Sequence, residues 1–208
     1  MKLQLHHNKN RQKGFTLIEI VVTVAVIGIV AVVSSSFNKD SVSLSRIFQT
    51  GLNASDEARR ILRPMSNEIR SASPSSAGAY PIESATSTSF VFFSDIDSDG
   101  LKERVRYYLS GNILKKGVIK PTGTPSAYPS NSEVVTDIVH GIQNGATPIF
   151  EYYDSNYDGT TSPLSQPVNI LAVRLIKITF IIDTDINKPP SSTTIGTQIS
   201  FRNLKDNL

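Results

Sequence analysis

An almost unbroken apolar run, Phe15–Val33, constrains this chain more than any other feature. At about 1.5 Å per residue it makes a helix of roughly 28 Å, close to the hydrocarbon thickness of a bilayer. The leader before it, Met1–Gly14, contains Lys and Arg but no acidic residue, which is typical of the cytoplasmic side of a first span. The sequence therefore predicts a single-pass protein of the cytoplasmic (inner) membrane, with its N-terminus inside and everything after Ser34 outside.

Glu19 is the only charged residue in the apolar run. A carboxylate within a span costs about 2.5–3.5 kcal/mol and usually has a partner. No Lys, Arg or His lies between Phe15 and Phe37. A cut between Gly14 and Phe15 would create an amino group at the depth of Glu19, and a neighbouring copy shifted along the helix axis would bring that amine to it. We interpret Glu19 as an assembly residue that sets the stagger between subunits.

The segment Lys13-Gly14-Phe15-Thr16-Leu17-Ile18-Glu19 closely resembles the prepilin-peptidase site of type IV pilins and pseudopilins. The resemblance implies cleavage after Gly14, N-methylation of Phe15, and pairing of Glu19 with that terminus during filament assembly. It also implies partners: a prepilin peptidase, other pilin or pseudopilin subunits, a polytopic assembly platform protein, a cytoplasmic assembly ATPase, and membrane lipid around the N-terminal helix. The alternative is an ordinary signal peptide or membrane anchor that contains a Glu.

The residues after the span continue a helical pattern. Their apolar side chains recur mostly three or four positions apart and form one stripe: Leu44, Ile47, Phe48, Leu52, Ala58, Ile61, Leu62, Met65 and Ile69. Such a stripe needs a partner, most simply a sheet packed against it. Pro64 is expected to kink this helix or to mark its end.

The expected fold is α+β: a long N-terminal helix, membrane-spanning in its first half, packed on an antiparallel β-sheet, as the pilin resemblance implies. We expect four segments: a cleaved leader (1–14), the transmembrane half of the helix (15–37), its extracytoplasmic amphipathic half (38–71) and a pilin-like β-sheet domain (72–208). Residues 71–89 are rich in Ser, Ala, Pro and Thr and predict a loop. Strands are predicted at 90–93, 104–109, 112–119, 134–142, 149–153, 169–182 and 195–201, with a hairpin around Ser110-Gly111 and a Pro-containing break at 186–194.

Charge does not favour a nucleic-acid partner. Removal of the leader reduces Lys and Arg from 21 to 17 against 18 Asp and Glu, so the mature side chains sum to about −1. The adjacent tyrosines at 107–108 and 152–153 would suit base stacking, but neighbours on a strand face opposite ways, so each pair is expected to split between core and surface. The arginines of the helix are interpreted as a solvated face or a subunit contact rather than a DNA or lipid site: Arg59, Arg60, Arg63 and Arg70.

Catalytic chemistry finds little support in the composition. The chain has no Cys, and His140 is the only His outside the leader. These counts exclude thiol catalysis, Cys-based zinc sites and multi-His centres. No Ser lies in an elbow-type nucleophile motif. We therefore expect no enzyme and no required cofactor.

The segment Asp95-Ile96-Asp97-Ser98-Asp99-Gly100 places three carboxylates at alternate positions, followed by a Gly that turns the chain. This spacing lets one loop surround Ca²⁺ with oxygen ligands, and Glu103 occupies the ninth position of an EF-hand-like register. The twelfth position, where a bidentate Glu belongs, is Arg106, so the full EF-hand motif fails. Asp95, Asp97, Asp99 and Glu103 are therefore candidate calcium ligands, with a plain acidic turn as the alternative. A second segment, Asp154–Gly159, has related spacing and is interpreted as a turn.

Two functions fit the resemblance: a minor pseudopilin of a type II secretion pseudopilus, and a minor pilin of a type IV pilus. Residues 58–71 and 201–207 also resemble J-type minor pseudopilins and related minor pilins, which favours the first. The alternative from another class is a monomeric exported binding domain on an uncleaved anchor.

Overall fold

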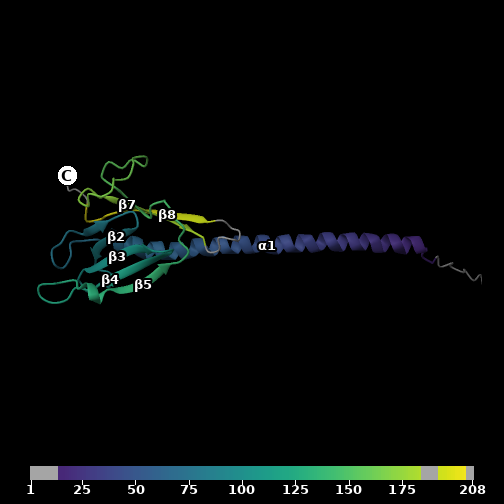
Figure 1. Ribbon diagram of the computed structural model, residues 1–208, viewed down its shortest axis with the longest axis horizontal. Helices are drawn as coiled ribbons and strands as arrows, with labels where there is room; N and C mark the ends of the chain where they lie inside the picture. The colour runs from purple at the N-terminus through teal and green to yellow at the C-terminus, as the bar shows by residue number, and fades with distance from the viewer. Residues whose placement is uncertain (1–13, 184–191, 205–208) are drawn as a thin grey trace, which may run out of the picture. The chain divides into compact units, whose positions relative to one another are not determined.

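The computed structural model describes residues 14–183 and 192–204, with side chains left out at 36–59. The predicted leader up to residue 13, most of the Pro-containing break and the last four residues of the chain lie outside the described residues. The chain divides into two compact units, Met1–Ile47 and Phe48–Leu208. A single helix, α1 (Leu17–Arg70), begins in the first unit and ends in the second (Figure 1).

Local hydrogen bonds fix both ends of α1. The Thr16 hydroxyl accepts a 3.3 Å hydrogen bond from the Glu19 N–H, which satisfies one of the free donors of the first turn. At the other end the Ser71 hydroxyl donates to the Asn67 carbonyl, 3.0 Å away. Pro64 lies inside the helix. The helix continues past it to Arg70, which excludes the second of the two expected effects, an end at Pro64, because packing of the last turns outweighs one lost backbone bond.

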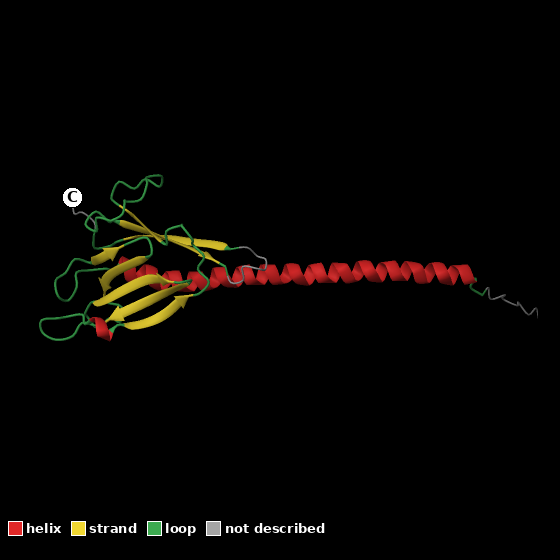
Figure 2. Cartoon of the chain, viewed as in Figure 1, coloured by secondary structure: helices red, strands yellow, loops and turns green. Residues whose placement is uncertain are grey.

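A five-stranded antiparallel sheet has the order β1-β2-β3-β4-β5. Its strands are β1 (Ile82–Ala85), β2 (Ser89–Ser94), β3 (Glu103–Ser110), β4 (Ile113–Ile119) and β5 (Val134–Val139), and a short 3-10 turn, η1 (Ser130–Ser132), precedes β5. The predicted β3–β4 hairpin is confirmed, with Ser110 paired to Ile113 (Figure 2). The predicted loop at 71–89 is wrong in part, because β1 lies within it. The polar composition of this segment does not predict a strand. The ends of the strand, Ile82 and Ala85, are buried because β1 pairs with β2.

A second antiparallel sheet contains β6 (Phe150–Tyr153), β7 (Leu175–Ile182) and β8 (Thr193–Ser200), in that order. Strand β7 alternates between half-buried and buried residues, as its sequence predicts. It begins six residues later than the predicted 169–182, because Asn169 starts a turn instead. The Asn169 carbonyl accepts from the Ala172 N–H at 3.0 Å, and its side chain accepts from the Leu171 N–H at 3.2 Å.

The core of the second unit joins both sheets to the last turns of α1. Leu62, Met65 and Ile69 of the predicted stripe are buried, which confirms that part of the stripe. Their side chains belong to one cluster with aromatic residues of β2, β6 and the C-terminal segment, including Phe90, Phe92, Phe150 and Phe201. The Phe90 and Phe92 rings stack with centroids 5.1 Å apart. The stripe residues before position 60 lie outside the described side chains. The arrangement is the predicted α+β, pilin-like organisation.

The paired tyrosines follow the strand rule in one case and break it in the other. Tyr107 is buried, whereas Tyr108 is half-buried beneath the Arg106 guanidinium, 4.0 Å from its ring centre. Tyr152 and Tyr153 are both buried, so the predicted split is wrong there. The ring of Tyr157, in the loop after β6, lies 4.2 Å from that of Tyr153 and covers it.

Candidate functional site

The predicted cleavage position lies in exposed, non-helical chain. Gly14, Phe15 and Thr16 precede the first turn of α1 and adopt no regular structure. Phe15 is 79 % exposed. A peptidase requires an exposed chain whose backbone is not hydrogen-bonded in a helix or sheet, because the substrate must fit into the peptidase cleft as an extended strand. The Gly14–Phe15 bond therefore meets this requirement without unwinding the helix.

Glu19 occupies the third position of α1 and is exposed. Within the described residues no basic group contacts its carboxylate. A carboxylate in the first turn of a helix interacts favourably with the helix dipole, so Glu19 has a local role as well as its predicted role in assembly. Thr16 and Glu19 also have the spacing of a capping box, of which the Thr16 half is formed. This capping signal is present in the sequence and adds a structural reason for a Glu at this position.

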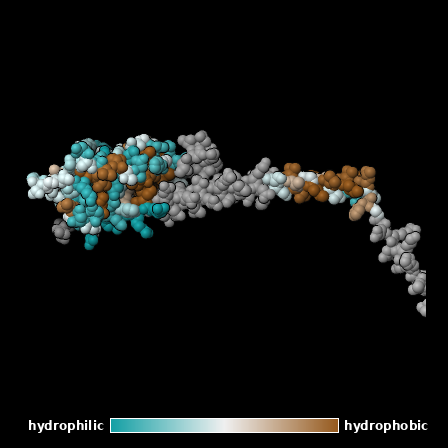
Figure 3. All heavy atoms as spheres, turned by 90° about the horizontal axis from the view of Figure 1, so that it is seen from below, coloured by the Kyte–Doolittle hydropathy of each residue, from teal (hydrophilic) through white to brown (hydrophobic). Residues whose placement is uncertain are grey.

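The first part of α1 is apolar on all sides. Leu17–Ser35 is long and hydrophobic enough to cross a membrane, with mean hydropathy 2.7, and none of it is buried. Signal sequences near an N-terminus meet the same test. Figure 3 shows these apolar side chains on the described part of the helix. Because a helix surface that is apolar apart from Glu19 and a few hydroxyl side chains is unstable in water, this segment requires lipid or other helices around it.

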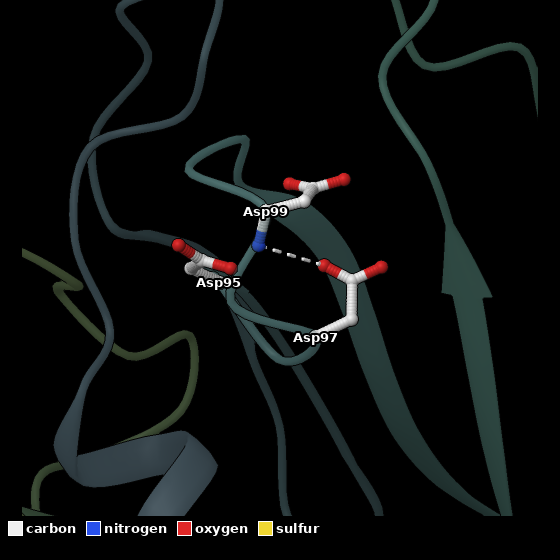
Figure 4. A group of neighbouring side chains, drawn as sticks. All are labelled: Asp95, Asp97 and Asp99. Atoms are coloured by element: carbon white, nitrogen blue, oxygen red, sulfur yellow. Dashed lines mark hydrogen bonds between the residues drawn. The ribbon is translucent and has the colours of Figure 1, made fainter.

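The predicted calcium ligands lie in and beside the loop between β2 and β3. Asp95, Asp97 and Asp99 each offer a carboxylate oxygen, and these oxygens lie within 4.8 Å of one another (Figure 4). The loop is turned by Ser98 at φ 62° and Gly100 at φ 92°, both left-handed. The Asp97 carboxylate accepts from the Asp99 N–H at 3.3 Å, and the Asp95 carboxylate from the Gly100 N–H at 3.1 Å. The loop thus gathers the three acidic side chains at one place.

Two lysines lie against this loop. Lys102 donates to Asp95 at 3.2 Å, and Lys120 of the segment after β4 pairs with Asp97. The hydrogen bond from Lys120 lowers the pKa of Asp97 from its ordinary value. At Asp95 partial burial raises the pKa, but the hydrogen bond and charge of Lys102 outweigh it, and the net pKa is lowered. The carboxylates of Asp95 and Asp97 are therefore ionised at neutral pH, as cation ligands must be.

Glu103, the first residue of β3, is fully buried. Its Oε2 accepts a 2.9 Å hydrogen bond from the N–H of Ile96, which lies between Asp95 and Asp97. Its Oε1 is buried and has no hydrogen-bond partner among the described residues. Burial raises the pKa of Glu103, the Ile96 N–H opposes this, and the charge of Asp97 adds to the increase. Arg106 occupies the twelfth position. Its guanidinium donates two hydrogen bonds to the Glu133 carboxylate, and it offers no oxygen ligand for a cation.

In the second acidic segment, Asp154–Gly159, the aspartate oxygens accept hydrogen bonds from neighbouring residues of the same turn. Asp158 Oδ1 accepts from the N–H and hydroxyl groups of Thr160 and Thr161, at 2.7–2.9 Å. These bonds hold the pKa of Asp158 far below its ordinary value. Asp154 accepts from the N–H and amide of Asn156. The segment is a hydrogen-bonded turn, as the sequence predicts.

One surface feature was missed from the sequence. A groove of about 650 Å³ lies between α1 and β8 and includes two of the predicted surface arginines; it is lined by Leu62, Arg63, Ser66, Asn67, Arg70 and Thr193–Thr197. It arises because β8 pairs with β7 on one side only, within the described residues. No local pattern signals it, because it depends on the placement of a strand more than a hundred residues after the helix.

Comparison with known families gives one match. Residues 9–35 match the family model described as the prokaryotic N-terminal methylation motif. The matched residues contain the Gly14–Phe15 bond, Glu19 and the apolar part of α1. No curated protein matches the chain. A motif of this kind in front of an apolar helix is typical of membrane-anchored, pilin-like proteins that a prepilin peptidase processes.

Proposed function

We propose that this chain is a structural subunit, and not an enzyme, that is assembled as a minor component into an inner-membrane filament, either a type II secretion pseudopilus or a type IV pilus. The observation that carries the proposal is the methylation motif at residues 9–35 on a helix whose apolar surface is exposed on all sides. A peptidase cuts between Gly14 and Phe15, and the new N-terminus is methylated. The N-terminus of the precursor is cytoplasmic. The second unit, Phe48–Leu208, which contains both sheets and is called the β-sheet unit below, lies outside the membrane.

Assembly then replaces lipid with neighbouring helices around α1. The released Phe15 amine and the Glu19 carboxylate are four residues apart, or about 6 Å along a helix axis. A neighbouring subunit displaced by that distance brings its amine to Glu19 of the subunit already in place. In an apolar surrounding this pairing neutralises two otherwise costly charges, and it therefore selects one stagger between subunits.

The β-sheet unit supplies lateral contacts and the filament surface. The likeness of residues 58–71 and 201–207 to J-type minor pseudopilins favours the pseudopilus over the pilus. Neighbouring genes for a secretin and sibling pseudopilins would support that choice, whereas genes for retraction or competence would support the type IV pilus.

Mass spectrometry of the mature N-terminus, from membranes of the native host, tests processing. We expect a chain that starts at Phe15 with one methyl group on its amine. A chain that starts at Met1 would instead support a monomeric binding domain on an uncut anchor. A start beyond Val33 would support a secreted domain.

Replacement of Glu19 tests assembly separately from processing. We expect Glu19→Ala to be cut and methylated normally but to be lost from sheared filaments. Thr23→Ala is the matched control, because Thr23 lies one turn further along the same helix and its hydroxyl only bonds the Glu19 backbone carbonyl at 2.6 Å. Normal incorporation of Glu19→Ala would reject the proposed role of Glu19.

A further inference from the structure

We infer that the loop between β2 and β3 binds one Ca²⁺ through Asp95, Asp97, Asp99 and the buried Glu103. This site lies within the β-sheet unit and does not depend on the proposed filament function. Its consequence is local: an ion would tie the start of β3 to the end of β2.

The spacing of the oxygens fits a calcium ion. Calcium takes oxygen ligands at about 2.3–2.6 Å, so two ligands on the same ion lie at most about 5 Å apart. The three aspartate oxygens of the loop meet this limit at 4.8 Å or less. All four proposed ligands are carboxylates, three of them on a loop, which suits calcium better than magnesium, because magnesium demands a rigid octahedral site.

Glu103 gives an independent reason to expect a cation. Its side chain is 0 % exposed, and Oε1 has no partner among the described residues. Oε2 binds the Ile96 N–H, so the carboxylate lies against the backbone of the acidic loop. A buried carboxylate oxygen without a partner is unfavourable, and a cation shared with the aspartates would remove that penalty. Asp95 Oδ1 is likewise buried without a hydrogen-bond partner in the described part of the chain.

The lysines set the expected strength of the site. Lys102 and Lys120 bind Asp95 and Asp97 and must yield those oxygens to an ion. Four carboxylates against two ammonium groups still leave a net charge of −2 around the loop. With this competition and no acid at position 106, we expect a dissociation constant of about 0.1–1 mM, as in extracellular calcium modules.

Calorimetric titration of the full chain in mild detergent, after treatment with a chelator, tests the site. We expect saturable heat with CaCl₂ at one ion per chain. Asp97→Asn should weaken binding about tenfold or more, because it removes one charged ligand. Asp158→Asn is the matched control and should bind calcium as the wild type does, because the Asp158 carboxylate already accepts hydrogen bonds within its own turn. Absence of saturable heat up to about 10 mM calcium, or equal loss in both variants, would overturn the inference.

A second variant separates a calcium site from a loop held only by ion pairs. Lys120→Gln removes the ammonium that competes for Asp97, so we expect it to bind calcium more tightly than the wild type. Calcium should also raise the melting temperature of this variant above that of its metal-free form. If Lys120→Gln melts at a lower temperature and calcium does not restore it, the loop is an ion-pair turn and the inference is wrong.

Discussion

The hydroxyl of Tyr107 on β3 donates a 2.7 Å hydrogen bond to the Glu68 carboxylate on α1. Lys116 on β4 donates to the other carboxylate oxygen at 2.6 Å. Burial, together with the charge of Glu68, raises the pKa of Tyr107 well above its ordinary value. One helix residue is thus bound by two adjacent strands, next to the apolar contacts of Met65 and Ile69. This polar contact fixes the register of the helix on the sheet, which apolar packing alone specifies less strictly.

Tyr107→Phe should destabilise the β-sheet unit. The substitution keeps the ring in the core but leaves a largely buried carboxylate oxygen without its donor, at a cost of about 1.5–3 kcal/mol. Chemical unfolding of the full chain in detergent, followed by near-ultraviolet circular dichroism, measures this. Tyr108→Phe is the control and should change stability by less than about 0.5 kcal/mol, because its side chain is half-buried on the other face. Equal effects of the two substitutions would contradict the role of the Glu68 contact.

Met65→Ala should also destabilise the unit, by about 2–4 kcal/mol, because Met65 is only 1 % exposed and truncation leaves a cavity between helix and sheets. Arg63→Ala, two residues earlier on the exposed face, is the control and should be nearly neutral. The same unfolding measurement applies. If Met65→Ala were neutral, the end of α1 would not be part of the core.

The α+β fold follows from patterns that act over short distances. One buried face of α1 carries the apolar stripe at Leu62, Met65 and Ile69, and one buried face of β7 carries every second residue of 175–182. The spacing of apolar residues along the sequence predicts such a face directly. The strand at 82–85 was missed because its burial comes from pairing with β2 rather than from its own composition. The predicted split of Tyr152 and Tyr153 between core and surface is wrong for a similar reason, since a loop that folds over the sheet covers the Tyr153 ring with that of Tyr157.

The candidate sites likewise divide into those that a contiguous stretch of sequence predicts and those that depend on the fold. The Gly14–Phe15 bond and Glu19 belong to a contiguous motif and were located from the sequence. The spacing of Asp95, Asp97 and Asp99 was equally visible. The burial of Glu103, the lysine partners of the loop and the groove beside β8 required the fold, because each depends on contacts between separate segments.

Lowering the pH should destabilise the turn at Asp158. Its folded pKa is lowered from the ordinary value of 3.8 by hydrogen bonds from Thr161 and Thr160, so the stabilisation is complete above that value. It is lost as the pH falls below 3.8 toward the folded pKa, because the unfolded chain then binds the proton first. We therefore expect the wild type to lose more stability than Asp158→Asn between pH 5 and pH 2.5, by unfolding at each pH. Parallel pH dependence of the two proteins would show that the turn does not hold Asp158 ionised.

Gly196→Ala should destabilise the sheet of β6, β7 and β8. Gly196 pairs with Thr179, and a Cβ at this position would lie 2.9 Å from the Ile178 carbonyl oxygen. That oxygen belongs to the backbone of the central strand, so relief requires a shift of the ladder, at a cost of about 1–3 kcal/mol. Alanine also lowers the conformational entropy of the unfolded chain, which stabilises the folded protein by only about 0.4–1 kcal/mol. Gly28→Ala makes the same chemical change where a Cβ has no neighbour within 4 Å, and it should leave the unfolding of the β-sheet unit unchanged. A Gly196→Ala protein as stable as the wild type would show that β8 is free to move away from β7.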